Sequence, residues 1–371
     1  MKIRVCKIDF TTVPINELNK ALAFYYGKSA YMTDEDGGTL CSDVDIDDSV
    51  INHLTMLTKS FHSNNKIIDK VLTQNEHPCC QMHSLSSTDI ELENNTLIFD
   101  NYSIECMHLL KLIYTQMADH SFSTCHVSVP NLIETTHLQT AGYFEKFPTQ
   151  AMLSATLPLD PARVKDFIGI QQENQLQALE LLTDKKYALN PVACYHVYSN
   201  FSKLYNKYQK HRFTIEGKAH RYEGKNSENG RLIEFNMAEI VFMENESNQI
   251  QTNDLIQFYK KFFLMLNLPI EFKTSSDAFF TVDARLYAQL QERTASKIEL
   301  ICNLDNKTLA IGSINTHHDF FSKRFNLTNR YGVISTKCTG IGIERLLIAL
   351  YSYHSNNVKE LLIHAYSSLN K

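Results

Sequence analysis

Apolar residues recur at helical spacing in several parts of the chain, with polar residues on the opposite side of each predicted helix. In the first of these segments the apolar positions include Ile104, Met107 and Leu110. Another opens with Asp160 as a candidate N-cap and Pro161 at the first helical position, which is a common helix start. The pattern predicts helices over 102–118, 161–182, 201–209 and 254–266.

Two other segments, 231–243 and 297–314, are rich in strand-forming residues with polar alternation. Near the C-terminus, residues 340–353 are typical of a glycine turn followed by a helix. Strands separated by helices of irregular length favour an α+β domain over a doubly wound parallel fold.

The N-terminal part differs from the rest and is divided from it near residue 90. Its pattern predicts one strand, one helix, an acidic loop and then a polar, irregular stretch, over 1–10, 15–26, 33–48 and 60–95. We therefore predict a small N-terminal extension, 1–90, and a main domain, 91–371. The role of the extension does not follow from its sequence.

The composition is that of an ordinary globular protein, with 43% hydrophobic and 21% charged residues. The sequence has no apolar run near the roughly 20 residues that a membrane-spanning helix needs, and no signal-peptide pattern at its start. These features predict a cytoplasmic protein without a membrane partner. The nine cysteines form no CxxC pair, so we expect thiols, some of which are candidate metal ligands.

The net charge of −5 bears on the class of partner. Proteins that grip a nucleic acid backbone usually carry a basic patch, because neutralising phosphates supplies much of the affinity. Lys and Arg are scattered in this sequence, with only modest local groups such as 203–212. The charge makes tRNA a less favoured partner without excluding it.

The strongest local motif is Thr-Gly-Ile-Gly-Ile-Glu-Arg over 339–345. Gly340 and Gly342 permit close backbone approach, and the N–H groups at a helix start favour an anion. Arg345 would present a permanently charged fork to phosphate. A glycine cap before a buried helix explains the motif equally well. It is neither a dinucleotide-binding fingerprint nor a phosphate-binding P-loop.

A second motif predicts a β-hairpin that begins at His220-Arg-Tyr-Glu and returns from Arg231 to Phe242. Arg221 and Glu223 would share one face of the first strand. An arginine suits the α-phosphate of ATP, a carboxylate suits the adenine amino group, and Phe235 suits stacking on the base. A salt-bridged surface hairpin is the alternative.

Together, the order Arg-x-Glu, loop, Arg-x-x-x-Phe and later Gly-x-Gly-x-x-Arg resembles motifs 2 and 3 of class II aminoacyl-tRNA synthetases. Further segments are similar to amino acid:[carrier protein] ligases, truncated homologues of the methanogen-type seryl-tRNA synthetases. The dimer-forming first motif is not placed. The further segments are 143–148, 193–198, 276–280 and 311–317.

The resemblance implies a catalytic zinc held by Cys194, Glu239 and Cys338. Two thiolates and a carboxylate leave one tetrahedral position open, which the family uses for the substrate's amino group. Buried apolar cysteines and a glutamate paired with arginine are the alternative. The resemblance also implies ATP and Mg2+, with Glu299 and Ser313 as candidates for the metal-bound nucleotide.

Two positions depart from the family pattern, Ala278 in place of proline and Ala310 in place of a magnesium-binding carboxylate. The stretch His317-His318-Asp319 resembles a metal site, but the family has none there, so we interpret it as a surface turn.

The resemblance predicts a homodimeric, ATP-dependent ligase that activates a small amino acid (glycine, alanine or serine class) as its adenylate. The expected acceptor is the phosphopantetheine thiol of a carrier protein. The alternatives are a seryl-like enzyme that charges tRNA and a non-catalytic, synthetase-like subunit that binds an amino acid.

Overall fold

The computed structural model describes residues 96–370 with short gaps, together with five short strands before them. The predicted helix over 15–26 and the candidate Glu223 lie outside the described residues. Within 96–370 the gaps are 174, 183–185, 223–230, 246–247, 278–287, 289–290, 292–293, 305–306 and 330–331.

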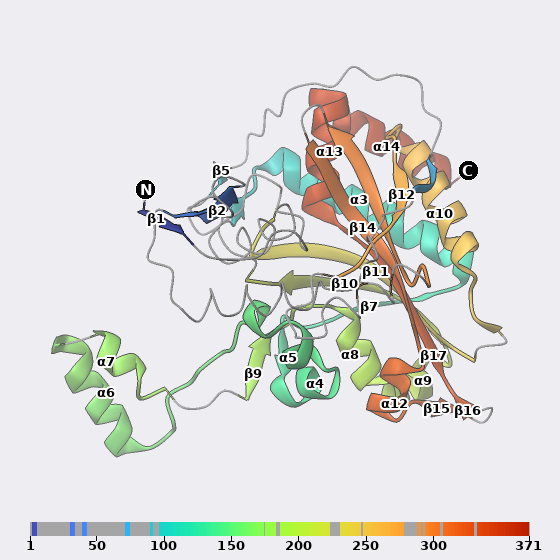
Figure 1. Cartoon of the computed structure of the whole chain (residues 1–371). Coiled ribbons are helices and arrows are strands. Elements are labelled where there is room, and N and C mark those ends of the chain that lie inside the picture. Colours follow the sequence, from blue (N-terminus) through green and yellow to red (C-terminus); the bar gives the residue numbers. More distant parts are fainter. Residues whose placement is uncertain are drawn as a thin grey trace.

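An eight-stranded sheet forms the centre of the protein (Figure 1). Every pair of neighbouring strands in it is antiparallel except β7 with β10, which is parallel, so the sheet is mixed. In spatial order its strands are β4 (Val71–Gln74), β12 (Glu271–Thr274), β13 (Lys297–Leu304), β14 (Lys307–His318), β17 (Ser335–Gly342), β11 (Glu234–Glu244), β10 (Arg212–His220) and β7 (Cys125–Ser128).

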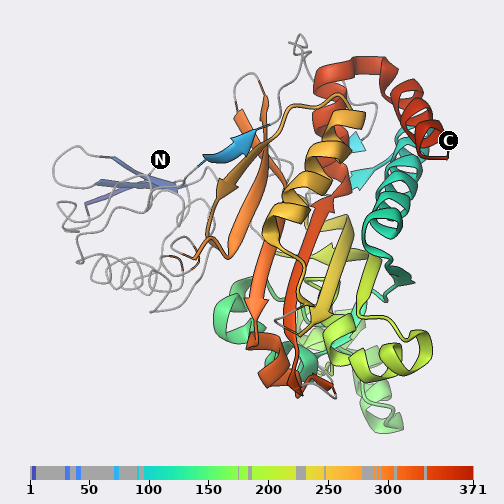
Figure 2. The same ribbon diagram turned by 90° about the vertical axis from the view of Figure 1, so that its right-hand side faces the viewer.

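One face of the sheet is covered by long helices, which Figure 2 shows side by side. Alternate residues of β11, among them Ala238, Ile240 and Phe242, pack against these helices in the larger hydrophobic core. Burial of these apolar side chains is the main stabilising contribution of this layer. The helices are α3 (Asn101–Phe122), α10 (Thr252–Met265), α13 (Ile343–His354) and α14 (Val358–Leu369).

Shorter helices lie on the opposite face, in a second core that contains Val241, Met243 and Cys338. Because β11 alternates its side chains, Glu239 points to this second face together with Val241. The covering elements are α4 (Thr135–Thr140), α5 (Tyr143–Lys146), η3 (Pro148–Gln150), α8 (Cys194–Ser199), α9 (Phe201–Tyr208) and α12 (Phe320–Phe325).

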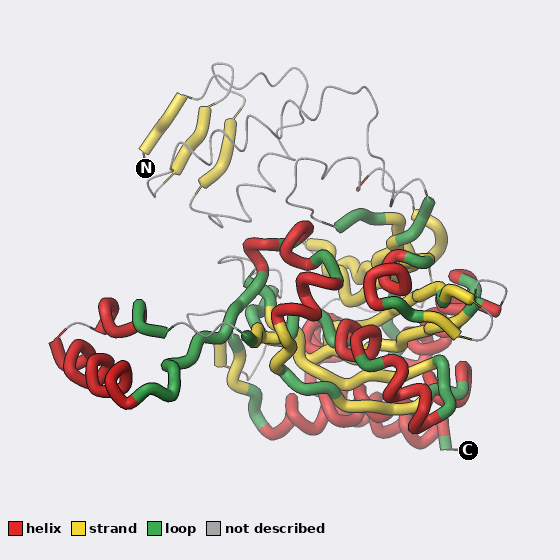
Figure 3. The backbone as a smooth tube through the Cα atoms, turned by 90° about the horizontal axis from the view of Figure 1, so that it is seen from below, coloured by secondary structure: helices red, strands yellow, loops and turns green. Residues whose placement is uncertain are grey.

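Two further helices, α6 (Pro161–Glu173) and α7 (Gln175–Leu179), project from the body of the protein in Figure 1 and Figure 3. The remaining elements are small. They are β1 (Lys2–Val5), β2 (Ala30–Thr33), β3 (Thr39–Ser42), β5 (Ile90–Glu91), β6 (Leu97–Ile98), β8 (Leu132–Glu134), β9 (Tyr187–Leu189), β15 (Thr328–Asn329), β16 (Gly332–Val333) and η6 (Ser355–Asn357).

The predicted glycine turn at 340–342 is wrong. Gly340 and Gly342 belong to β17, which runs into α13 at Ile343 without an intervening loop. The glycine at 340 serves close strand packing: a Cβ there would lie 2.7 Å from Glu239 Cγ and 3.1 Å from the Ala238 carbonyl oxygen.

The predicted α+β class and the helices of the main domain are confirmed, although 161–182 is divided between α6 and α7. The expected strand 297–314 is instead a hairpin of β13 and β14. Two N-terminal predictions are wrong in part, because β3 lies within the expected loop 33–48 and β4 within the irregular stretch 60–95. Partner strands decide both cases, since β3 pairs with β2 and β4 with β12.

Among the described helices, none combines the length and the apolar character that crossing a bilayer requires.

Candidate active site

The predicted hairpin is present as the antiparallel pair β10 and β11, and Arg221 follows it directly. The Arg221 N–H still donates to the Ile233 carbonyl at 2.9 Å, while Nε donates to the Pro191 carbonyl at 2.9 Å. The guanidinium carbon lies 5.6 Å from the centre of the Phe235 ring, within cation–π range. The prediction that Arg221 lies within the first strand is corrected, because β10 ends at His220.

Four candidate positions form one row across the sheet. Glu299 is paired with Ser313, Ser313 with Gly340, and Gly340 with Glu239. Paired residues point to the same face of a sheet, so the row lies on the face that carries the second core. Gly340 has no side chain between Ser313 and Glu239, and Glu239 packs closely against it in the buried middle of the row.

The three predicted zinc ligands come together above this row. Cys194 is the first residue of α8, and Cys338 lies on β17 two positions before Gly340. The side chains of Cys194, Glu239 and Cys338 are all buried. The Cys194 thiol is hydrogen-bonded to Cys338, and the N–H groups of Cys194 and Ala193 bond to the Glu239 carboxylate. Glu239 lies 45 positions after Cys194 and Cys338 a further 99 positions on, yet the three residues converge at one point of the fold.

The electrostatics of this cluster are those of negative groups held out of water. Burial and, next to it, the neighbouring Cys338 together raise the pKa of Glu239 to about 8, while Arg221 opposes the shift. The hydrogen bond from Cys194 lowers the pKa of Cys338 well below its usual value. Burial raises the pKa of Cys194. A divalent cation would stabilise all three deprotonated groups.

The donor set fits zinc in its chemistry, since thiolate and carboxylate are both zinc ligands. One oxygen of Glu239, Oε2, is buried without a hydrogen-bond partner among the described residues, which is the expected position of a group that completes its bonding elsewhere. In the described part of the chain, however, no three His, Cys, Asp or Glu side chains are already gathered as a metal site.

A buried lysine organises the edge of the site beside Glu299. Lys297 Nζ lies 2.7 Å from Asp277 Oδ1 and 3.3 Å from Glu299 Oε1. Gln291 Nε2 donates to Asp277 Oδ2 at 2.8 Å. Burial opposes ionisation of Asp277, but Lys297 and these hydrogen bonds outweigh it and lower the pKa of Asp277. Sequence reasoning did not identify Lys297, although its alternation with Glu299 on one strand places both on the same face.

The remaining candidates lie farther along the same elements. Arg345, in the first turn of α13, donates from Nη1 to the Ala310 carbonyl on β14 at 3.0 Å. Gly342 is the N-cap of that helix. Arg231 is exposed just before β11. Arg345 belongs to α13 and Arg221 follows β10, so the two arginines come from different elements of the fold.

The interpretation of 317–319 as a surface turn is wrong at His317. Its Nε2 lies 3.8 Å from Cys338 Sγ, and Asn315 Nδ2 lies at the same distance from that sulfur. Ser313, Asn315 and His317 follow one another at alternate positions of β14. This period of two was the signal in the sequence that all three share one face.

A measured test of the close packing at Gly340 compares two alanine substitutions. Gly340→Ala is expected to destabilise the protein by about 1–3 kcal/mol, because the new Cβ meets Glu239 and the backbone of Ala238. Gly342→Ala is the matched control, since its Cβ would lie 3.7 Å from the nearest atom, the Ile311 carbonyl oxygen. Urea unfolding of both variants gives the difference, and equal stability would contradict the packing at Gly340.

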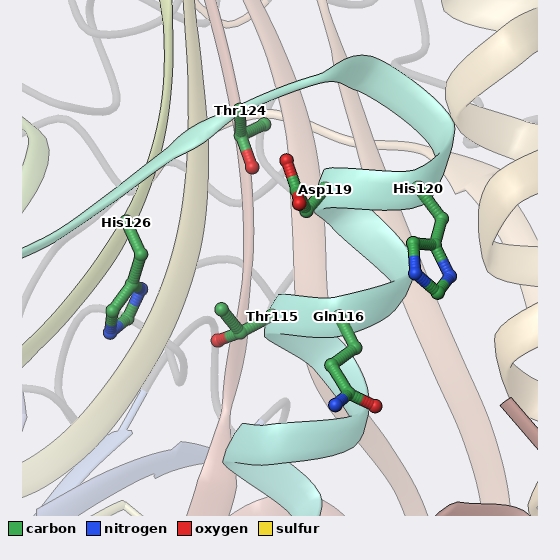
Figure 4. Close-up of a pocket in the computed structure, with 6 residues that line it drawn as sticks. All are labelled: Thr115, Gln116, Asp119, His120, Thr124 and His126. Carbon is green, nitrogen blue, oxygen red and sulfur yellow. The ribbon is translucent and has the colours of Figure 1, made fainter. Parts of the chain in front are cut away.

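Figure 4 shows a pocket of about 320 Å³ in another part of the molecule, between α3 and β7. None of the candidate residues lines it, and α3 covers the opposite face of the sheet from Cys338. The pocket is therefore separate from the candidate active site. Its lining residues are Thr115, Gln116, Asp119, His120, Thr124 and His126.

Comparison with known proteins agrees with this architecture. Residues 179–354 match the tRNA synthetase class II core domain (G, H, P, S and T). The structure of M. kandleri SerRS in complex with A. aeolicus tRNASec is similar at 18% identity and a TM-score of 0.69, over 91% of this chain and 73% of that chain. A comparison with curated protein sequences finds no match.

Two other solved structures are similar. The P. horikoshii seryl-tRNA synthetase complexed with ATP matches at 13% identity and a TM-score of 0.54, over 73% of this chain and 57% of that chain. The Giardia lamblia prolyl-tRNA synthetase in complex with prolyl-adenylate matches at 14% identity and a TM-score of 0.50, over 70% and 48%. This chain thus spans about half the length of these two proteins. Residues 179–354 are thus similar to the class II aminoacyl-tRNA synthetase core domain, in a chain whose α+β fold is similar to that of seryl-tRNA synthetases.

Proposed function

We propose that the protein activates a small α-amino acid with ATP, forming an aminoacyl-adenylate and releasing pyrophosphate. The observation that carries this proposal is the convergence of Cys194, Glu239 and Cys338 beside Arg221, on one face of a class II sheet. A buried set of two thiols and a carboxyl group suits a metal ion that would take the free amine of an amino acid, and Arg221 supplies a fixed cation for a negative group of the substrates.

The nucleotide is assigned to the row and hairpin next to this cluster. Arg221 binds the α-phosphate and Arg345 the γ-phosphate, while Phe235 stacks on adenine. The chemical step is attack of the amino acid carboxylate on the α-phosphorus, which depends on positioning and charge neutralisation rather than on a covalent enzyme intermediate.

Six further residues complete the nucleotide assignment. Gly340 and Gly342 would let the ligand approach the backbone, Glu223 would accept a hydrogen bond from the adenine amino group, and Arg231 is assigned to the same nucleotide. Glu299 and Ser313 hold Mg2+ and the phosphate oxygens. Because Lys297 contacts Glu299 at 3.3 Å, magnesium binding at Glu299 would compete with that ion pair.

We assign Cys194, Glu239 and Cys338 as ligands of zinc. When bound, the ion would supply a Lewis-acid position for the free amino group of the substrate. The chain's own contribution is to orient that ligand set: the N–H groups of Ala193 and Cys194 fix the Glu239 carboxylate. Recognition of the amine in this way selects α-amino acids without a large side-chain pocket.

The direct test is ATP–pyrophosphate exchange measured with each of the twenty amino acids in turn. We expect exchange with glycine, alanine or serine and little with large side chains. Binding of an amino acid without any exchange would instead support the non-catalytic alternative, a synthetase-like subunit that senses an amino acid. If the protein neither binds an amino acid nor catalyses exchange, both hypotheses are contradicted.

For the acceptor, we propose the phosphopantetheine thiol of a carrier protein. Support comes from the segments around Cys194, Asp277 and Ser313 that resemble the carrier-protein ligases, and from the net charge of −5. Attack of the thiol on the adenylate carbonyl would form a thioester and release AMP.

Charging of tRNA is the second candidate, and one observation favours it. The match to M. kandleri SerRS covers 91% of this chain, so it extends into the N-terminal 1–90, where the sequence alone indicated no resemblance. That structure contains a bound tRNA. An N-terminal part shared with such a protein suits an RNA-binding appendage.

Transfer of radiolabelled amino acid distinguishes the two acceptors. With ATP present, we expect label on purified holo carrier protein and none on bulk tRNA from the same organism. The apo carrier protein, which lacks the thiol, is the matched control. Label on tRNA alone would reject the carrier-protein assignment and leave the activation step standing.

We also propose a homodimer. The four-residue strand β7 lies at the end of the sheet and pairs only with β10 among the described strands. An edge with free backbone groups is a ready position for pairing with a second copy. Sedimentation of the purified protein should give twice the mass of 42.7 kDa.

A further inference from the structure

The side chain of His317 occupies a position that neither the proposed nucleotide site nor the zinc ligand set uses. It lies on β14 between Asn315, which faces the candidate site, and His318, which is exposed. The register of β14 against β17 shifts at this point: Thr316 pairs with Lys337, but His318 pairs with Thr336. His317 is thus the extra residue of a β-bulge, and the exposed His318 adopts a φ of 51°.

A β-bulge frees one residue from the cross-strand ladder and turns its side chain, and such bulges are common beside active sites. In this bulge the imidazole reaches across to the neighbouring strand. Nε2 lies 3.8 Å from Cys338 Sγ, and Nδ1 lies 3.5 Å from the Thr336 hydroxyl. Both ring nitrogens therefore face groups on β17.

Two aromatic rings hold the imidazole in this orientation. The Phe321 ring lies 4.8 Å from it at an interplanar angle of 69°, and the Tyr198 ring lies 6.2 Å away at 79°. Tyr198 and Phe321 also stack on each other at 4.7 Å. Tyr198 comes from α8, the helix that begins at Cys194, so one packed unit joins His317 to both cysteines.

We propose that His317 is a positioning residue, donating from Nε2 to the Cys338 sulfur and fixing its orientation as a metal ligand. This assignment rests on the proposed zinc site. It requires the tautomer with the proton on Nε2. The Thr336 hydroxyl then has two acceptors within reach, since Nδ1 and the His318 carbonyl oxygen both lie 3.5 Å from it. Asn315 Nδ2 donates to the same sulfur and to Ser313 Oγ, at 3.8 and 2.9 Å.

Groups that orient a metal ligand tune the site even though they do not touch the ion, and losing one typically weakens metal binding by about 10- to 100-fold. The two donors to Cys338 differ in how they are held. Asn315 is paired in the ladder with Cys338 itself, whereas His317 depends on the bulge and on its aromatic neighbours. We therefore assign the larger effect to His317.

Three variants test the proposal. His317→Phe keeps an aromatic ring against Tyr198 and Phe321 but removes the donor. His317→Gln retains an amide N–H that can take the place of Nε2. His318→Asn is the matched control, because it removes the adjacent, exposed imidazole and asparagine tolerates a positive φ.

The readouts are zinc affinity, by competition with a chelator, and the sulfur-to-cobalt charge-transfer band of the protein loaded with Co2+. We expect His317→Phe to bind zinc about 10- to 100-fold more weakly and to shift the band. His317→Gln should recover most of both, and His318→Asn should match the wild type. If His317 served only in packing, His317→Gln would not restore the zinc affinity or the band.

Unchanged affinity and an unchanged band in His317→Phe would overturn the role of His317 while leaving the zinc site intact. Failure of the wild-type protein to bind zinc or cobalt would overturn the zinc site and, with it, this inference. The two failures are therefore distinguished by the wild-type titration.

Discussion

Arg221→Ala is expected to lower amino-acid-dependent ATP–pyrophosphate exchange by about 100- to 1,000-fold. A preorganised cation aimed at the charge that develops in the transition state contributes on this scale. Arg221 is preorganised here, because its Nε is fixed to the Pro191 carbonyl and its guanidinium lies over Phe235. The rates of ATP–pyrophosphate exchange of the wild type and the variant, both at saturating amino acid, measure the loss.

Arg345→Ala should cause a loss of the same order, expressed mainly as weaker ATP binding, because this residue is assigned to the γ-phosphate. Arg163→Ala is the matched control, since Arg163 is an exposed arginine on the projecting helix α6. Full exchange activity in both site variants would refute the assigned roles. Activity lost in the control as well would indicate a general effect of removing arginine.

Cys338→Ala is expected to abolish stoichiometric zinc binding and to reduce exchange by at least about 100-fold. A Lewis-acid metal contributes several kcal/mol to the reactions it serves, and each 1.4 kcal/mol corresponds to a factor of ten. Elemental analysis of protein purified without chelators gives the zinc content, and the exchange assay gives the rate.

Cys302→Ala is the matched control for this substitution. Cys302 is an equally buried cysteine on β13, but it belongs to the core on the helix-covered face of the sheet. Its loss should lower stability without changing zinc content. A Cys338→Ala protein that folds, exchanges normally and contains as much zinc as the wild type would disprove the ligand assignment.

The main domain was largely predictable, because its helices carry strong periodicity. The apolar stripe of α3 places that helix to within a few residues, and the Asp160-Pro161 signal places the start of α6, although not its end. Strand pairing was less predictable, since it depends on contacts far along the chain. The short strand β4 resembles a loop by composition and becomes a strand only by pairing with β12.

Prediction of the candidate site from the sequence was limited in the same way, by contacts between residues far apart along the chain. Cys194, Glu239 and Cys338 lie too far apart in the sequence for spacing to reveal them, and they were found by resemblance to a family. No such resemblance pointed to His317 or Lys297. The period of two along β14 indicates only the face on which His317 lies, whereas its contact with Cys338 also depends on a one-residue register shift between β14 and β17.

The direct passage of β17 into α13 has a mechanical consequence. Cys338 and Arg345 are seven positions apart on a segment without a flexible joint. Under the proposed roles, this segment fixes the distance between the residue that serves the amino group of the amino acid and the residue that serves the terminal phosphate of the nucleotide. The acceptor or the outer helices could change in evolution without altering this distance. Adding or removing a residue between Cys338 and Arg345 would instead change the position of one substrate relative to the other.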